Sequence, residues 1–268
     1  MYPPVSDLLA ELSLFPGRED GLRKIKRYSN EKVAFYRSSD FSHSKRVAWL
    51  VYSLIPLLSE VDKTFDIGRA VAMALVHDDA ELITGDHQAG NKSKMTKEQL
   101  AAIADEEREA IAALAKRYPK TLGGYVYQDL VQDLADLKNS EAHFVKYFDR
   151  FDALGETYHE LFAGNVVWTQ NVVNEWGIIP TPFMYYYDRL PPMVEKYPIL
   201  TALKGKHVFF DVPEAREWES FVLTRQPHTK DSILASTGHR QYDAWRSVVI
   251  DSADQEEIAN LYSQQEYL

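Results

Sequence analysis

Residues 75–86, with the sequence LVHDDAELITGD, bring a histidine and several carboxylates together directly after an apolar stretch. The apolar residues of 67–75 recur at the spacing of one helix face. Continuing that spacing turns Asp78 toward the core, with His77 and Glu81 beside it. A buried carboxylate without a partner costs several kcal/mol, so it needs a counter-charge, a proton or a metal ion. The pattern therefore predicts a polar site at the inner end of this helix.

Two further predicted helices turn ligand-type side chains inward. The apolar stripe of the helix over residues 43–61 continues backwards to His43. In the long helix predicted over 140–165, Asp149 falls on the apolar line of the helix. Together the three helices supply two imidazoles and two carboxylates. This mixture suits a divalent ion of intermediate hardness, such as Mn, Fe, Co, Ni or Zn.

Each of these signals has an ordinary alternative. A single inward histidine is more often a hydrogen-bonded core residue than a ligand, and a single acid on an apolar stripe often reflects a misjudged helix phase. Taken together, however, three apolar helix stripes that are each interrupted by residues able to bind a metal favour a metal site. Asp79 and Asp152 receive no role and are expected to be solvated or hydrogen bonded, and His143 and His159 are expected on the surface.

The composition limits the function classes. The 268 residues are 45% hydrophobic, which is enough for a full-sized core. A formal net charge of -10 and a pI of about 5.3 argue against a nucleic-acid binder, although a few local cations still suffice for a small anionic substrate. The absence of cysteine excludes disulfides, thiolate metal sites and cysteine nucleophiles. Neither a signal peptide nor a membrane-spanning run is found, so a cytoplasmic location without a membrane partner is expected.

The pattern changes along the chain. Helical periodicity dominates to about residue 165, and Thr96 with Gln99 is expected to form a capping box at the start of a charged amphipathic helix. The stretch 174–200 is rich in Tyr and Pro, which predicts short, broken helices. Its aromatic residues either pack the C-terminal part onto the domain or offer a surface for a homodimer.

The C-terminal part has weaker signals. Residues 204–213, KGKHVFFDVP, are expected to form one short strand or an extended crossing, and 252–265 a last helical patch. We therefore expect an all-α domain over residues 1–203. A mostly helical or irregular extension over 204–268 is expected to pack on it.

The order His, His-Asp, Asp resembles that of the HD-domain superfamily of metal-dependent phosphohydrolases. The form HD-x-x-E-x-x-x-G-D over residues 77–86 is similar to the 5′-deoxynucleotidase branch of that superfamily. FVKYFDRFDAL at 144–154 resembles the V-K-x-x-D segment of the branch, and AGN follows at a similar distance. The resemblance covers roughly residues 20–175 and implies a helical bundle of the HD type.

Specific roles are implied by the resemblance, residue by residue. It implies that one divalent ion, with Mn, Co, Fe, Ni, Mg and Zn all open, is bound by His43, His77, Asp78 and Asp149. Glu81 takes the position of the catalytic acid, and Asp86 that of the residue contacting the sugar hydroxyl. Lys92 and Arg27 match basic positions that bind phosphate, and Tyr28 the aromatic position beside the base.

The implied reaction is hydrolysis of a deoxynucleoside 5′-monophosphate to nucleoside and phosphate by a metal-activated water. Two departures keep alternatives open. Ser42 stands where the family usually has an acidic residue immediately before the first histidine, and about ninety C-terminal residues are unmatched. The substrate of the same fold could instead be a nucleoside triphosphate, an alarmone or a non-nucleotide phosphate ester. A non-catalytic scaffold with a structural metal is the third hypothesis.

Overall fold

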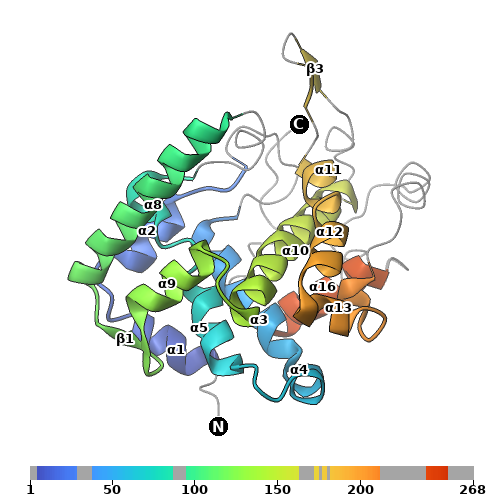
Figure 1. Cartoon of the computed structure of the whole chain (residues 1–268), viewed down its shortest axis with the longest axis horizontal. Coiled ribbons are helices and arrows are strands. Elements are labelled where there is room, and N and C mark those ends of the chain that lie inside the picture. The colour runs from blue at the N-terminus through green and yellow to red at the C-terminus, as the bar shows by residue number, and fades with distance from the viewer. Residues whose placement is uncertain are drawn as a thin grey trace. The chain divides into compact units, whose positions relative to one another are not determined.

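The computed structural model is built almost entirely of helices (Figure 1). It describes residues 5–28, 38–86, 95–162, 172–174, 177–179, 182–211 and 240–252. The strands of these residues form two short antiparallel hairpins, so the predicted all-α class is confirmed. Among the described helices, none combines the length and the apolar character needed to cross a membrane.

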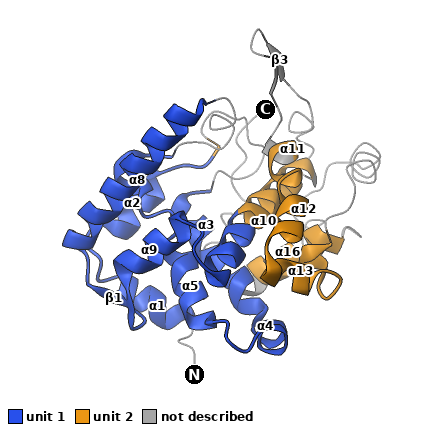
Figure 2. Ribbon diagram, viewed as in Figure 1, with its two compact units in different colours: residues 1–27, 38–149 blue, residues 28–37, 150–268 orange. Residues whose placement is uncertain are grey.

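The contacts divide the chain into two compact units (Figure 2). The first consists of residues 1–27 and 38–149, and the second of residues 28–37 and 150–268. This division differs from the domain boundary that we expect after residue 203, and that boundary stays a prediction.

The first unit contains most of the predicted helices. Its helices are α1 (Val5–Leu12), α2 (Arg18–Lys24), α3 (Asp40–Ser53), α4 (Ile55–Val61), α5 (Ile67–Val76), α6 (Glu81–Thr84), α8 (Lys97–Arg117) and α9 (Tyr127–Ala135). The hairpin β1 (Thr121–Leu122) and β2 (Tyr125–Val126) joins α8 to α9. The long helix α10 (Ser140–Phe162) begins in this unit. The capping box of Thr96 and Gln99 is present at the start of α8, as predicted.

The core of the first unit is the packing of α3 along α5. Every residue of α5 except Arg69 is buried, which is why its sequence carries almost no polar face. A capping box of Ser39 and Ser42 starts α3 earlier than the apolar stripe alone suggests. The single helix expected over 43–61 is interrupted at Leu54, because Pro56 lies in the first turn of α4 and cannot continue the preceding helix.

The HD motif lies in a tight turn after α5. The helix ends at Val76, and the backbone N–H groups of Asp79 and Glu81 donate to the carbonyls three residues earlier, at 3.1 and 2.9 Å. The short helix α6 then ends at Gly85, whose φ of 72° favours glycine. The continuous helical phase expected through Glu81 is therefore replaced by a tighter turn.

The second unit is built on the C-terminal half of α10. Its other elements are β3 (Val172–Asn174), β4 (Gly177–Ile179), α11 (Pro182–Tyr187), α12 (Leu190–Lys196), α13 (Pro198–Leu203), η2 (Val208–Phe210) and α16 (Arg240–Ser252). The short α11, α12 and α13 confirm the prediction of broken helices, whereas the hairpin of β3 and β4 was not expected. The strand or extended crossing expected around Val208 was wrong, because these residues form a 3₁₀ turn that buries Phe209 and Phe210. The helical patch expected over 252–265 lies outside the described residues beyond Ser252.

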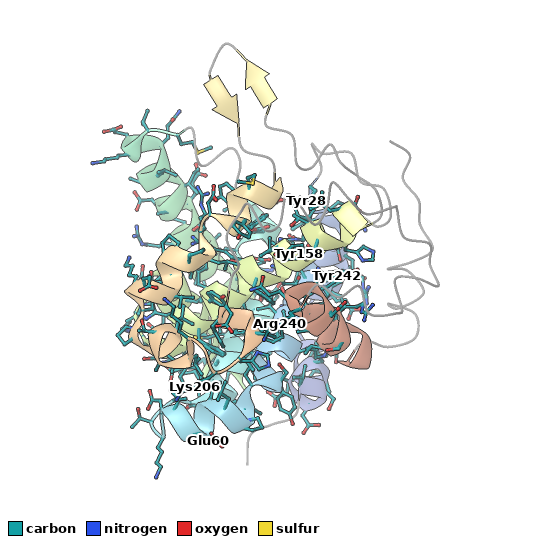
Figure 3. The ribbon with its side chains drawn as sticks, turned by 90° about the vertical axis from the view of Figure 1, so that its right-hand side faces the viewer. Tyr28, Glu60, Tyr158, Lys206, Arg240 and Tyr242 are labelled. Carbon is teal, nitrogen blue, oxygen red and sulfur yellow. The ribbon has the colours of Figure 1, made fainter. Side chains whose placement is uncertain are left out.

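Polar contacts fix α16 against α10. The indole N–H of Trp245 donates to a carboxylate oxygen of Asp152 at 2.8 Å. Asp152 was expected to be either solvated or hydrogen bonded, and it is hydrogen bonded. Tyr158 and Tyr242 lie side by side, with ring centroids 6.3 Å apart (Figure 3). The surface position expected for His159 was wrong: it is 4% exposed, and its Nδ1 is 2.8 Å from the Tyr242 hydroxyl.

Candidate metal site

Three elements of the first unit bring together the four residues that the sequence suggested as metal ligands. His43 comes from α3, His77 and Asp78 from the turn after α5, and Asp149 from α10. The Nε2 atom of His43 is 3.2 Å from Asp149 Oδ1 and 3.9 Å from Asp78 Oδ2. The Nε2 atom of His77 is 3.1 Å from Asp78 Oδ2 and 3.8 Å from Asp149 Oδ1. Each nitrogen therefore faces both carboxylates.

The tautomer of His77 is set by its backbone contact. Its Nδ1 lies 2.8 Å from the carbonyl oxygen of Ala74, which can only accept a hydrogen bond, so Nδ1 carries the hydrogen. In the neutral imidazole the Nε2 lone pair then faces the carboxylates. A backbone carbonyl on one ring nitrogen and an open second nitrogen is the arrangement that prepares a histidine to bind a metal.

Both carboxylates of the cluster are held in the ionised form. Burial by itself raises the pKa of Asp78, but the neighbouring His77 and His43 outweigh it and lower the pKa to about 2. Burial acts in the same direction on Asp149, whereas the Lys146 ammonium at 2.6 Å and the hydrogen bond with His43 hold its pKa well below the usual range. Two negative groups thus share a small volume with two imidazoles.

The donor set fits a divalent cation. Ligand atoms of His43, His77 and Asp149 all lie within 4.8 Å of one another. His77 Nε2 and Asp78 Oδ2 are buried and have no hydrogen-bond partner among the described residues. Unsatisfied buried atoms of this kind are costly, and a cation between them would satisfy both. Imidazole nitrogens with carboxylate oxygens suit ions of intermediate hardness.

A second group of acids lies beside the cluster. Glu81 is half-buried, and its pKa is raised well above the usual range by burial and by the carboxylates of Asp78, Asp40 and Asp86. Asp86 is half-buried near the end of this segment. Asp40, which the sequence patterns did not single out, is fully buried three residues before His43 on α3. The i, i+3 spacing of Asp40 and His43 on one helix face was the available signal.

Of the basic and aromatic residues suggested for substrate binding, the structure describes Arg27 and Tyr28 but not Lys92. The Arg27 backbone N–H donates to the Ser38 carbonyl at 3.0 Å, which ties Arg27 to the start of α3, and its charge acts on Asp40. Tyr28 belongs to the second unit, where its hydroxyl donates to the Ala153 carbonyl at 3.2 Å. Lys92 lies outside the described residues.

A buried ion pair holds Asp79, the residue that follows the His77-Asp78 pair in the chain. The Arg18 guanidinium donates to both carboxylate oxygens of Asp79 at 2.9 Å and to the carbonyl of Leu75 in the last turn of α5. The Tyr127 hydroxyl donates to Asp79 Oδ2 at 3.0 Å. Arg18 is 2% exposed and Asp79 is fully buried. Asp79 was expected to be either solvated or hydrogen bonded, and it is hydrogen bonded. These bonds anchor the turn that carries His77 and Asp78.

This helical domain has the features of the HD-domain superfamily. One helix supplies a histidine, the end of a second supplies a His-Asp pair, and a third supplies an aspartate. The family model described as 5′-deoxynucleotidase YfbR-like matches residues 20–175, more than half of the chain. The chain belongs to this YfbR-like family.

Individual proteins are also similar to parts of this chain. The chain is 33% identical over 102 residues to 5′-deoxynucleotidase HDDC2 of Dictyostelium discoideum, a match that spans 38% of this chain and half of the relative's length. A conserved hypothetical protein from Pyrococcus furiosus has a TM-score of 0.52 at 19% identity, over 77% of this chain and 98% of the other, and this likeness shows the shared fold alone. A predicted metal-dependent phosphohydrolase from Magnetospirillum magnetotacticum overlaps at a TM-score of 0.40 with 27% identity, over 63% of this chain and 78% of the other.

Proposed function

We propose that this protein is a metal-dependent phosphomonoesterase that hydrolyses deoxynucleoside 5′-monophosphates to nucleoside and phosphate. The observation that carries the proposal is the buried cluster of His43, His77, Asp78 and Asp149 with the acid Glu81 beside it, in a chain of the YfbR-like family. The 5′-deoxynucleotidase relative from Dictyostelium supports the nucleotide class of substrate. The cytoplasmic location, the homodimer and the absence of a nucleic-acid partner stay predictions from the sequence.

The four ligands would hold one divalent ion, which when bound lowers the pKa of a coordinated water and offsets the charge of the phosphoryl group. Glu81 follows the His-Asp pair by one turn and orients the attacking water or protonates the leaving oxygen. Arg27 and Lys92 bind the equatorial phosphate oxygens, where positive groups stabilise the charge that develops in the transition state. Asp86 contacts the sugar hydroxyl, and Tyr28 lies beside the base. No nucleophilic side chain is required.

The direct test is phosphate release from a panel of deoxy- and ribonucleoside 5′-monophosphates. Protein treated with a chelator will lose at least about 100-fold in rate, and Mn, Co, Fe, Ni, Mg or Zn added singly will identify the ion that restores it. Faster turnover of the deoxy substrates is expected if Asp86 reads the sugar. Phosphate release at the full rate by metal-free protein would contradict the proposal.

A related phosphate ester is the second candidate. Ser42 in place of the family's acidic residue and the residues outside the matched range 20–175 are the observations that favour it. Product analysis separates the two, since a monophosphatase releases orthophosphate and a triphosphohydrolase releases tripolyphosphate. Stoichiometric metal binding without phosphate release from the monophosphate panel would favour this candidate.

The Glu81→Gln variant distinguishes an enzyme from a scaffold. Because Glu81 is an acid beside the cluster and is not one of its four proposed ligands, we expect about 100- to 10,000-fold slower turnover with unchanged metal content. The measurement is a steady-state rate together with metal analysis of the purified variant. If the protein were a non-catalytic scaffold, the wild-type protein would already release no phosphate. An unchanged rate in an active protein would remove Glu81 from the mechanism.

A further inference from the structure

Asp79 is a buried carboxylate that the proposed mechanism does not use. It follows the His77-Asp78 pair directly in the chain and is fully buried. Arg18, the first residue of α2, donates from Nε to both of its oxygens at 2.9 Å, and the Tyr127 hydroxyl of α9 donates at 3.0 Å. A buried ion pair is often no more stabilising than apolar residues of the same size. Stability alone therefore does not account for a charged pair at this position.

Arg18 also binds the end of α5. The helix ends at Val76, and the Asp79 N–H donates to the Val76 carbonyl at 3.1 Å, whereas a continuing α-helix would use the Leu75 carbonyl. The Arg18 guanidinium donates to that Leu75 carbonyl. A cation at this end of a helix is also favoured by the helix dipole. Arg18 thus caps α5 at the residue where the tight turn begins.

The two contacts of Arg18 bracket the proposed ligands. Leu75 lies two residues before His77, and Asp79 one residue after Asp78. Between them, His77 Nε2 lies 3.1 Å from Asp78 Oδ2. Ligand atoms have to be held within about 0.5 Å of the geometry that a metal ion requires. A change in the backbone of this turn would therefore displace both ligand atoms at once.

We propose that Arg18 is a positioning residue for the metal site: by binding the turn on both sides, at the Leu75 carbonyl and the Asp79 carboxylate, it keeps the His-Asp pair in the geometry that binds a divalent ion. The metal site is part of the proposed function, on which this inference rests, whereas the contacts of Arg18 are independent of it. Arg18 is not itself a ligand, and it acts through the backbone of the turn.

The surroundings of Arg18 hold it in place. Its backbone N–H donates to the Phe15 carbonyl at 3.2 Å, and the Phe15 ring packs edge-on against that of Tyr127, with the centroids 5.5 Å apart. The two donors to the buried carboxylate are thereby linked to each other. One turn further along α2, a Cβ on Gly21 would lie 2.4 Å from Leu82 Cδ2, so this helix lies directly against α6. The helix α2 therefore supports both the turn and the helix that follows it.

Metal titration of a variant without the ion pair separates positioning from stability. The double variant Arg18→Met with Asp79→Leu removes both buried charges, so much of the stability lost in Arg18→Met is restored. It does not restore the hydrogen bond to the Leu75 carbonyl. Calorimetric titration of the chelator-treated full chain with Mn²⁺ will therefore give a Kd about 10- to 100-fold weaker than that of the wild type, the range for removing groups that orient metal ligands. Thermal unfolding of the same samples shows that the variant is folded at the temperature of the titration.

A second variant keeps the test independent of folding. Arg18→Lys retains the positive charge beside Asp79, but a single ammonium cannot reproduce the planar fork that binds both the carboxylate and the Leu75 carbonyl. We expect a Kd for Mn²⁺ about 3- to 10-fold weaker than that of the wild type. Asp133→Asn is the matched control, because it removes the charge of a buried carboxylate that is paired with Arg69 in the same unit. Its Kd will stay within about twofold of the wild type.

The outcomes separate this inference from the proposed function. Wild-type affinity for Mn²⁺ in both Arg18→Lys and the double variant would overturn the positioning role, and so would an equal loss of affinity in Asp133→Asn. A wild-type protein that binds Mn²⁺ and releases no phosphate from any nucleotide of the panel would contradict the proposed function, while the comparison of Kd values would still decide the role of Arg18. A wild-type protein that binds no divalent ion would contradict both.

Discussion

Replacing Asp78 with asparagine will remove the metal ion and lower phosphate release by at least about 1,000-fold. Asp78 Oδ2 is the oxygen nearest to His77 Nε2, at 3.1 Å, and it also faces His43. It has no hydrogen-bond partner among the residues that the structure describes, so its negative charge is the property that a cation would use. An amide has the same shape without that charge, which makes it a poor ligand in a site that already contains two neutral imidazoles.

The Asp78→Asn protein will still fold in the absence of metal, with a modest loss of stability. The histidines lower the Asp78 pKa from 3.8 to about 2 in the folded protein. A lowered carboxyl pKa contributes stability that is present above about pH 4 and is lost as the pH falls toward 2. At pH values above about 4 at which the two imidazoles are still protonated, its removal therefore costs about 2 kcal/mol of unfolding free energy.

Metal content and thermal unfolding with and without chelator check the Asp78 prediction. The ion should raise the Tm of the wild-type protein and leave that of Asp78→Asn unchanged. Asp133→Asn serves again as the control, since its partners Arg69 and Lys138 lie outside the cluster. Full metal stoichiometry in Asp78→Asn would contradict the assignment of Asp78 as a ligand.

Replacing Arg18 with methionine will destabilise the protein by about 3–5 kcal/mol, the largest effect on folding that we expect from a single substitution. Asp79 is fully buried and receives two hydrogen bonds from Arg18 Nε and one from Tyr127. Without Arg18 the carboxylate keeps only the Tyr127 hydroxyl, and the Leu75 carbonyl loses its side-chain donor. Breaking a buried pair on one side leaves a charge that the interior cannot solvate.

Two further variants show whether the Arg18 effect comes from the unpaired charge. The double variant Arg18→Met with Asp79→Leu removes both charges and should recover at least about half of the lost stability, because apolar replacements of a buried pair are often close to neutral. Arg23→Met removes a pair with Glu19 whose side chains are half exposed, and it should change stability by less than about 1 kcal/mol. Denaturant unfolding of chelator-treated protein measures all three. Equal losses in Arg18→Met and Arg23→Met would contradict a special role for the buried pair.

The sequence by itself determined the helices and the inward direction of the ligand-type residues. The periodic apolar positions of α3, α5 and α10 predict both, because burial of one face is a local property of a helical segment. His43 and Asp149 were found in this way, 106 residues apart, and they lie 3.2 Å from each other. The capping box of Thr96 and Gln99 is equally local, and it was also predicted correctly.

Only the tertiary structure decided which polar groups meet away from these stripes. Arg18 lies 61 residues from Asp79, and nothing in the local sequence distinguishes this buried pair from surface charges. From the sequence, Asp40 looks like an ordinary acid in the first turn of a helix, where exposed acids are common. Its burial depends on the elements packed around it. His159 was misplaced for the same reason, because its partner Tyr242 belongs to another helix. Periodicity records which face of an element is buried, whereas the partner of each buried charge is fixed by contacts between segments far apart in the chain.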